Sequence, residues 1–418
     1  MDKKEGKQRK SPVNASSLTT IVATSIVAIM LVIPLYFGAI VQTGISAYGQ
    51  LIPPSQLQQG GEGSQSIILN GAGATFPFPL IDTWRVEYQS VNPSVSINYQ
   101  SIGSGGGVRQ FTERTVDFGA SDAPLTQEEM QALSSSSTPV HIPETIGSVV
   151  AAYNIPGVDK GLKLTGPVLA DIFAGKITKW DDPRIMELNA GIQLPSTDII
   201  TVHRSDGSGT TFIWTSYLSH VSPEWNQTIG AGKSVQWTVG LGASGNEGVS
   251  STIKSTPNSI GYVELTYALT TDMDYASLMN QAGNFVEPTL NSTQAAAQNA
   301  IIMNTSGTTI TNSSSTAGGS ISLPAGDQPW NHVSLLDAPG ADSYPIASFS
   351  YLLLYKELST NINSMEKAQA LAQFVNWAIT DGQQFASPLH YVPLPESVVQ
   401  HNQQTLRSMT FNGQPVFQ

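Results

Sequence analysis

Four short segments rich in glycine and hydroxyl residues contain the groups of this chain that could bind a ligand. They are residues 71–77 (GAGATFP), 103–107 (GSGGG), 119–123 (GASDA) and 204–211 (RSDGSGTT). Each follows a predicted strand, and the first, second and fourth lead into a predicted helix. A helix begins with N–H groups that lack acceptors and with a partial positive charge, so it can hold a phosphate-like anion without a formal cation. Together the segments predict one site for a small oxyanion.

Arg204 is the only basic residue in these segments. Its planar guanidinium fits two oxygens of a tetrahedral anion, and Asp206 could pair with it and fix its orientation. An ordinary surface pair in a turn is the alternative interpretation. Because the sequence GSGT follows directly and precedes a helix, the segment favours anion binding.

Thr75, Phe76 and Ser104 lie where the first two of these helices are predicted to begin. Thr75 could offer both its N–H and its hydroxyl, and Phe76 its N–H. Ser104 could act like Thr75, since the glycines after it permit close backbone approach. The plainer alternative is that Thr75 and Ser104 only cap their helices.

Asp122 is an acidic residue in a segment that is predicted to bind an anion. Inorganic phosphate near neutral pH keeps at least one P–OH group, because its second ionisation falls at a pH similar to that of phosphate monoesters, about 6, and leaves its third proton in place. An ionised carboxylate only accepts hydrogen bonds, so Asp122 could bind that P–OH. Sulfate has no proton to donate and would leave the carboxylate unpaired, which predicts selectivity against sulfate. Asp122 could instead cap the turn before Pro124.

The composition excludes several other kinds of site. The chain of 418 residues has a formal net charge of −12, is 12% charged and lacks cysteine. Five basic and two acidic residues among the first ten leave −15 for the rest, which disfavours nucleic-acid binding. Thiolate metal sites, cysteine nucleophiles and disulfides are excluded.

The sequence contains little that points to an enzyme. Residues 71–76 lack the third glycine of a dinucleotide-binding motif, and residues 207–211 lack the lysine of a nucleotide-binding Walker loop. The histidines are scattered, with no His-x-x-x-His pair. Ser121 and Ser208 have no evident base partner. We therefore expect no catalysis, no cofactor and no bound metal.

The N-terminal region predicts a membrane anchor. Residues 18–41 form an apolar run after a basic decapeptide, and as a helix they would extend about 36 Å, enough to cross a hydrocarbon core of about 30 Å. We expect residues 1–48 to be an uncleaved anchor with its basic end cytoplasmic and the rest of the chain exported. A cleaved signal ending near residues 46–48 is the alternative. Residues 49–66, rich in Gln, Gly, Ser and Pro, predict a flexible tether.

From residue 67 onward, short β-branched or apolar runs alternate with amphipathic helical patterns. This alternation predicts an α/β fold. Residues 126–129 (TQEE) fit a capping box at the start of a helix. Residues 145–153 and 344–355 are long apolar runs that could be strands crossing between two lobes.

These segments, in their order along the chain, resemble the phosphate-binding proteins of ABC-type phosphate importers, the PstS family. The resemblance covers essentially everything after the tether. It is carried by GAGATFPFPLIDTW (71–84), INYQSIGSGGGVRQF (97–111), VDFGASDAPLT (116–126), FAGKITKWDDPRI (173–185), VHRSDGSGTTFIWTSYL (202–218), VGLGASGNEGV (239–249), IGYVE (260–264) and DAPGADSYPI (337–346).

The resemblance implies a class II periplasmic-binding-protein fold, in which two α/β lobes are joined by two crossover segments. The first lobe would hold residues 67–148 and 344–418, and the second lobe residues 149–343. It also implies a receptor, not an enzyme, that captures inorganic phosphate and delivers it to the transmembrane subunits of an ABC permease. We expect a monomer on the outer face of the cytoplasmic membrane.

Carried over by position, the resemblance implies which residues would bind phosphate. They are Thr75, Phe76, Ser104 and Asp122 of the first lobe and Arg204, Ser208, Gly209 and Thr210 of the second, with Asp206 supporting Arg204. Gly105 stands where relatives often have a second serine, so one hydroxyl could be missing. The Ser/Thr-rich residues 303–322 and the anchor also depart from the soluble periplasmic pattern.

Three other functions remain open from the sequence. The protein could be a receptor for sulfate, molybdate or another oxyanion, although Asp122 argues against a proton-free anion. It could be an anchored phosphatase, which the absence of a metal-binding cluster disfavours. It could also be an adhesion or surface-layer protein that kept the fold without the ligand and would show no phosphate-induced thermal shift.

Overall fold

The computed structural model describes residues 66–133, 138–299, 301–303, 309–311 and 323–417. The chain divides into two units, residues 1–64 and 65–418, and all described residues belong to the second. The predicted anchor helix, residues 18–41, and nearly all of the predicted tether lie outside the described residues. Within the part of the chain that the structure describes, no helix is both long and apolar enough to span a membrane.

One mixed sheet runs through this unit, with its strands in the order β2-β1-β3-β15-β4-β8-β6-β7 and β9 attached to β4. At one end β1 pairs in parallel with β2 and β3, and at the other β6 pairs in parallel with β7 and β8. The bounds of these outer strands are β1 (Ile67–Gly73), β2 (Val95–Ser101), β3 (Phe118–Ser121), β6 (Ile200–Arg204), β7 (Leu241–Ala243), β8 (Ser259–Glu264) and β9 (Asp274–Tyr275).

Strand β4 (Pro139–Asn154) belongs to both ends of the sheet. Its first part pairs antiparallel with β15 (Ala347–Tyr355), and from Val149 onward it pairs antiparallel with β8. The change of partner falls between Ser148 and Val149, at the position that the family resemblance implies for the lobe boundary. All residues of β4 except Asn154 are buried, as expected for a strand that is covered on both faces.

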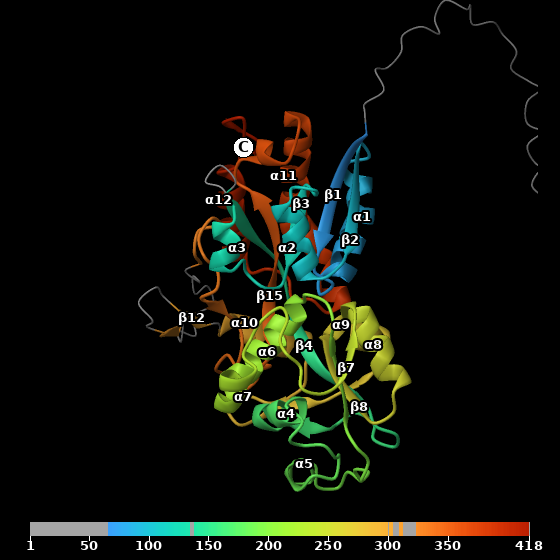
Figure 1. Cartoon of the computed structure of the whole chain (residues 1–418). Helices are drawn as coiled ribbons and strands as arrows, with labels where there is room; N and C mark the ends of the chain where they lie inside the picture. The colour runs from blue at the N-terminus through green and yellow to red at the C-terminus, as the bar shows by residue number, and fades with distance from the viewer. Residues whose placement is uncertain (1–65, 134–137, 300, 304–308, 312–322, 418) are drawn as a thin grey trace, which may run out of the picture. The chain divides into compact units, whose positions relative to one another are not determined.

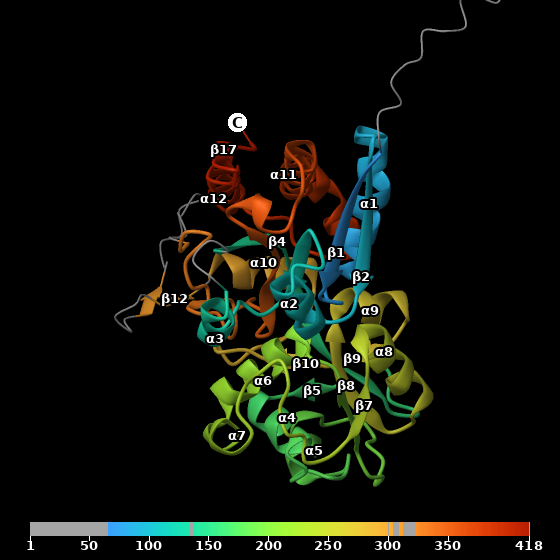
Figure 2. The same cartoon turned by 45° about the horizontal axis from the view of Figure 1, so that its top comes forward.

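The helices separate into two groups around the sheet, so the unit has two α/β lobes (Figures 1 and 2). Those around β1–β3 and β15 are α1 (Phe78–Val91), α2 (Ser104–Thr112), α3 (Gln127–Gln131), α11 (Met365–Ile379) and α12 (Glu396–Arg407). Those around β6–β8 are α4 (Gly166–Phe173), α5 (Pro183–Leu188), α6 (Gly209–Val221), α7 (Pro223–Thr228), α8 (Gly245–Ser255) and α9 (Leu265–Thr270). Helix α10 (Leu290–Gln298) contacts both β4 and β15.

Short elements complete the described part of the chain. The small sheets contain β5 (Lys163–Leu164), β10 (Ser277–Met279) and β11 (Phe285–Val286); β12 (Ile301–Met303), β13 (Thr309–Thr311) and β14 (Val333–Ser334); and β16 (Thr410–Phe411) with β17 (Gln414–Pro415). The 3-10 turns are η2 (Leu358–Thr360), η3 (Asp381–Phe385) and η4 (Ser387–Leu389).

Local sequence signals explain several element boundaries. The predicted capping box is confirmed: Thr126 Oγ1 accepts the N–H of Glu129, whose carboxylate accepts the N–H of Thr126. The strand predicted from residue 344 begins later, at Ala347, because Pro345 has no N–H to donate to a ladder.

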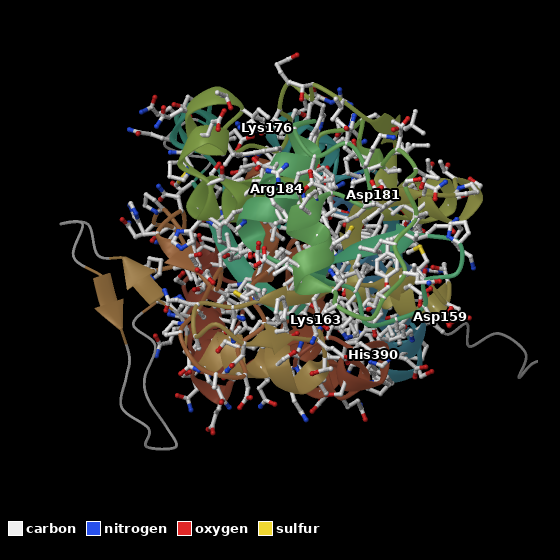
Figure 3. The ribbon with its side chains drawn as sticks, turned by 90° about the horizontal axis from the view of Figure 1, so that it is seen from below. Asp159, Lys163, Lys176, Asp181, Arg184 and His390 are labelled. Atoms are coloured by element: carbon white, nitrogen blue, oxygen red, sulfur yellow. The ribbon has the colours of Figure 1, made fainter. Side chains whose placement is uncertain are left out.

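The surface of the second lobe carries charges of both signs. Figure 3 shows Lys176 and Arg184 on the same face as Asp159 and Asp181. Arg184 Nη1 donates to the Asp171 carboxylate at 2.8 Å. Exposed pairs of this kind add little to stability, and the labelled residues form no patch of a single sign.

Candidate functional site

The fold carries all four predicted segments to the carboxyl ends of parallel strands. Thr75 follows β1, Ser104 follows β2, Asp122 follows β3, and Arg204 ends β6. Because the carboxyl ends of parallel neighbours meet at one edge of a sheet, the first three segments come together in the first lobe. Contacts between Arg204 and this group place the fourth segment against them.

Arg204 is 3% exposed, and its guanidinium contacts both lobes. Its Nε and Nη2 donate to the two carboxylate oxygens of Asp206 at 2.7 and 2.5 Å, so the predicted pairing is confirmed. Its Nη1 donates to Thr75 Oγ1 at 3.2 Å and to Thr210 Oγ1 at 3.4 Å. The bidentate pair fixes the plane of the guanidinium and leaves Nη1 directed between the lobes.

Thr75 does not cap helix α1. Pro77 occupies the N-cap position, and no side chain caps this helix. Thr75 Oγ1 accepts hydrogen bonds from Arg204 Nη1 and, at 2.8 Å, from Asn246 Nδ2. The plainer interpretation of Thr75 as a helix cap is therefore wrong, and its hydroxyl faces residues of the second lobe.

The first turns of α2 and α6 meet although they belong to different lobes. A Cβ placed on Gly209 would lie 2.5 Å from both Ser104 Oγ and Asp122 Oδ2, so the approach requires glycine there. The Gly105 N–H also donates to the Gly207 carbonyl at 2.8 Å. Ser104 and Gly209 are the first residues of their helices, where N–H groups have no intrahelical acceptor. Two positive helix ends therefore converge on one place.

Ser208 and Thr210 are fully buried at the start of α6. Ser208 Oγ caps the helix by accepting the Thr211 N–H at 3.0 Å. Thr210 Oγ1 accepts from Arg204 Nη1 and, at 3.2 Å, from Asn246 Nδ2. In these bonds the hydroxyl oxygens act as acceptors, so their own protons remain for donation to an anion.

Phe76 lies beside Thr75, just before α1 begins, and its side chain is buried. Its carbonyl accepts the hydroxyl of Tyr391 at 2.7 Å, and the two rings pack with centroids 6.3 Å apart. These contacts fix the backbone of Phe76. Its predicted contribution, the N–H group, is thereby held next to the Thr75 hydroxyl.

Asp122 is 1% exposed and lies against donors from its own lobe. Ser350 Oγ donates to Asp122 Oδ1 at 2.8 Å, and the Asp122 N–H donates to Ser104 Oγ at 3.2 Å. Burial raises the pKa of Asp122 to about 7, although the bonds from Ser350 and Ser104 and the charge of Arg204 oppose the rise. At neutral pH the ionised acceptor that the sequence predicts is therefore one of two populated forms.

The pKa of Asp206 is shifted in the opposite direction from the pKa of Asp122. Burial opposes its ionisation, but its bidentate bonds to Arg204 outweigh burial and lower its pKa. The Gly245 N–H, at the start of α8, also donates to its Oδ1 at 3.1 Å. Asp206 thus stays ionised and neutralises most of the charge of Arg204.

Asn246 is a site residue that the sequence reasoning missed. It is fully buried near the start of α8, and its amide contacts the Thr75 and Thr210 hydroxyls. Its Oδ1 accepts the Glu264 N–H at 3.1 Å, which fixes the orientation of the amide. A sequence signal could have indicated Asn246, because residues 244–246 (SGN) repeat the Ser-Gly-polar pattern of residues 208–210 (SGT).

An ion pair between the lobes was also missed. Lys233 Nζ contacts the Glu129 carboxylate of α3, and the Lys233 carbonyl accepts the Ser208 N–H at 2.8 Å. Lys233 therefore links the first lobe to the segment that starts α6. Lys233 and Glu129 are far apart in sequence and fit no motif, so this contact could not be predicted.

Other candidate chemistry is absent from the described residues. No group of three or more His, Cys, Asp or Glu among them could hold a metal ion. His203 stacks on Trp237 with ring centroids 4.7 Å apart. Ser121 Oγ donates to the Ala123 carbonyl at 2.6 Å, which ties it into the turn.

The fold and this site define a two-lobed α/β binding protein. A family model described as a PBP superfamily domain matches residues 58–381. Among solved structures, the phosphate-binding protein from Stenotrophomonas maltophilia has a similar fold, with a TM-score of 0.59 at 20% identity over 80% of this chain and 92% of that chain.

Two curated relatives are much closer in sequence. The phosphate-binding protein PstS of Xylella fastidiosa (strain 9a5c) is 41% identical over 358 residues, which are 85% of this chain and 88% of that protein. PstS of Pasteurella multocida (strain Pm70) is 43% identical over 338 residues, which are 81% of this chain and 89% of that protein. The chain belongs to the PBP superfamily and, within it, to the PstS family of phosphate-binding proteins.

Proposed function

We propose that this protein captures inorganic phosphate outside the cytoplasmic membrane and delivers it to an ABC-type import permease. One observation carries the proposal: hydroxyl and first-turn N–H donors from both lobes converge on one buried place that also holds a paired arginine and a carboxyl. The relatives named phosphate-binding protein PstS, which align with 81–85% of this chain, support the same ligand.

In this proposal the ligand contacts come from both lobes. The donors are the hydroxyl, N–H or guanidinium groups of Thr75, Phe76, Ser104, Arg204, Ser208, Gly209 and Thr210, and Asp206 orients the guanidinium. Because the cation is already paired, most of the binding energy would come from oriented neutral donors. Binding would stabilise the closed arrangement of the lobes only through these contacts, by a shift of population.

Asp122 would distinguish phosphate from sulfate. In its ionised form it accepts the P–OH proton, whereas a fully ionised anion would face an unpaired buried carboxylate. A pKa of about 7 means that the carboxyl can also bind a proton itself, so discrimination should be strongest above neutral pH.

The role proposed is binding, not catalysis. Ser121 is tied into its own turn and Ser208 caps α6, so neither hydroxyl is placed as a nucleophile beside a general base. Transport proteins of this kind need to bind and release their ligand unchanged, which the arrangement of donors permits.

We further propose that the protein acts as a monomer attached to the outer face of the cytoplasmic membrane. Support comes from the apolar residues 18–41 after a basic decapeptide, with residues 49–66 as the tether. The permease subunits are its expected protein partner, as for a receptor of the phosphate importer class.

Isothermal titration of the purified full chain with inorganic phosphate and then with sulfate tests the function. We expect phosphate affinity at micromolar Kd or tighter, about −8 kcal/mol or stronger, and far weaker sulfate binding. Equal affinity for the two anions would favour a general oxyanion receptor. The absence of binding heat and of any phosphate-induced thermal shift would favour a protein that kept only the fold.

A further inference from the structure

A second group of buried side chains lies directly behind Asp122. Ser350 Oγ is 2.8 Å from Asp122 Oδ1 and 2.9 Å from Glu144 Oε1. These residues come from three neighbouring parts of the sheet: the end of β3, β15 and β4. All three are at most 1% exposed. Two contacts therefore lead from the ligand site to a carboxyl inside the first lobe.

An irregularity in the sheet directs Glu144 to this place. In the β4–β15 ladder, Thr145 pairs with Ser350 and Pro143 pairs with Tyr351, so Glu144 is an extra residue without a partner. Such a bulge changes the direction in which a side chain points. Without it, the regular alternation of β4 would not carry this carboxyl to the Ser350 hydroxyl.

One hydroxyl group lies between two carboxyl groups here. The Ser350 hydroxyl has one proton, but two carboxyl oxygens lie within hydrogen-bond distance of its oxygen. Two full hydrogen bonds therefore require a second proton, carried by Asp122 or by Glu144. Two ionised carboxylates sharing one donor in a buried site would also repel each other strongly.

The surroundings favour Glu144 as the protonated member. Asp122 has further stabilisation for its charge, because Ser104 Oγ lies 3.3 Å from its Oδ2 and Arg204 is nearby. Glu144 Oε2 has no hydrogen-bond partner among the described residues. A neutral carbonyl oxygen tolerates this isolation better than a charged one. Burial, together with the charge of Asp122, raises the pKa of Glu144 to about 8, although the hydrogen bond with Ser350 opposes the rise.

Other titratable groups also face this region. Burial raises the pKa of Glu264, at the end of β8, and of Tyr99, on β2, well above their usual values, and it raises the pKa of Tyr351 on β15. Burial disfavours the charged form of each of these groups. Arg204 is therefore the cation that biases the pair, and it lies on the Asp122 side.

We propose that Glu144 is a positioning residue for phosphate recognition: its neutral carboxyl donates to Ser350 Oγ and so directs the Ser350 proton to Asp122 Oδ1. Asp122 Oδ1 is then satisfied, and Oδ2, which lies 3.3 Å from Ser104 Oγ, can accept the P–OH of the ligand as a further hydrogen bond. Without this donor, Ser350 can accept from an Asp122 protonated at Oδ1, which would leave Asp122 neutral and its Oδ2 an uncharged, weaker acceptor for the P–OH. The proposal rests on the phosphate-binding function proposed above.

Two substitutions separate the donated proton from the shape of the side chain. Glu144→Met keeps a similar length without a donor, and Glu144→Gln keeps a donor that cannot ionise. In titrations of the full chain with inorganic phosphate, we expect Glu144→Met to weaken binding by about tenfold and Glu144→Gln to recover most of that loss. Thr145→Val is the matched control, because Thr145 is an adjacent, fully buried residue whose hydroxyl has no partner among the described residues.

Several results would overturn this role. Equal losses in Glu144→Gln and Glu144→Met, or unchanged affinity in Glu144→Met, would exclude a donated proton. If Glu144→Met does not fold, Ser350→Ala removes the same link and should also weaken phosphate binding by about tenfold; wild-type affinity in that variant would refute the proposal. Failure of the wild-type chain to bind phosphate would instead refute the proposed function.

Discussion

At the scale of single residues, the site depends on groups that are oriented before a ligand arrives. Arg204 is held by Asp206, and the Thr75 and Thr210 hydroxyls accept from Arg204 and Asn246. Since these oxygens already act as acceptors, their protons are directed elsewhere. The same buried environment also makes the charge of each carboxyl sensitive to its neighbours.

Asp122→Asn is expected to relax discrimination against sulfate. The amide can donate to a fully ionised oxyanion, which the carboxylate cannot do. We expect the ratio of sulfate Kd to phosphate Kd to fall by about tenfold or more, measured by competition titration above pH 7. An unchanged ratio would count against Asp122 as the discriminating group.

The stability of Glu144→Gln relative to the wild type should depend on pH. The pKa of Glu144 is about 8 in the folded protein, against about 4.3 for a glutamate in an unfolded chain. Between these values the folded state holds a proton that the unfolded state releases, so wild-type stability falls as pH rises. Glutamine removes this cost, so its advantage should grow between pH 5 and pH 8, by an amount on the order of 1–3 kcal/mol.

Thermal unfolding without phosphate, followed at pH 5, 6, 7 and 8, measures this difference. The other titratable groups are the same in both proteins, so the contributions of those that do not contact Glu144 largely cancel in the comparison. A difference that does not change with pH would mean that Glu144 is ionised in the folded protein.

At the scale of elements, helix ends and strand irregularities build the site. The first turns of α2 and α6 supply N–H groups from opposite lobes, and the bulge at Glu144 turns a carboxyl toward Ser350. Glycine at position 209 is what permits the two helix ends to approach.

Gly209→Ala should abolish tight phosphate binding while leaving each lobe folded. The added Cβ would lie 2.5 Å from Ser104 Oγ and Asp122 Oδ2, so the lobes could not approach as closely. Alanine suits the first turn of a helix, so little stability should be lost. We expect phosphate Kd to rise by about a hundredfold, since several hydrogen bonds depend on this approach.

Gly248→Ala provides the matched control for that experiment. Gly248 lies in α8, and its added Cβ would meet Ala243 Cβ at an ordinary 3.6 Å. It should keep wild-type phosphate affinity. Wild-type affinity in Gly209→Ala would show that this contact between the lobes is not needed for binding.

The elements around the site could be predicted because their signals are local. Glycine-rich segments after strands gave Thr75, Ser104 and Arg204, and the capping box gave the start of α3. Asn246 could have been predicted, since residues 244–246 repeat the Ser-Gly-polar pattern of residues 208–210. Glu144 could not have been predicted, because the bulge arises from the pairing of two strands about 200 residues apart and neither strand's sequence indicates it alone.

At the scale of the whole molecule, contacts between the lobes determine how readily the site closes. Lys233 and Glu129 form an ion pair across them, beside the main-chain bond from Gly105 to Gly207. Neither contact belongs to the groups proposed to bind phosphate. Both should therefore change affinity by changing the closed population, without altering selectivity.

Glu129→Gln should weaken phosphate binding by about two- to fivefold, as expected for a partly exposed ion pair, and leave the sulfate-to-phosphate ratio unchanged. Lys367→Met is the control, since the Lys367–Asp117 pair (2.8 Å) lies within the first lobe. Titration of both variants measures the effect. Equal losses in the two variants would point to general destabilisation instead of a contribution to closure.

The proposed anchor makes a prediction about the mature protein. If residues 18–41 are retained in the bilayer, the chain should stay in the membrane fraction after alkaline extraction, and its intact mass should include the N-terminal residues. A released protein that begins near residues 46–48 would instead identify a cleaved signal.

Strand β4 has a mechanical consequence for how such a receptor would open. It passes without interruption from one lobe into the other and exchanges β15 for β8 between Ser148 and Val149. Because β4 joins the lobes without an intervening loop, any rotation of the lobes has to twist this buried strand slightly. Opening and closing would therefore rotate the lobes about an axis near that point.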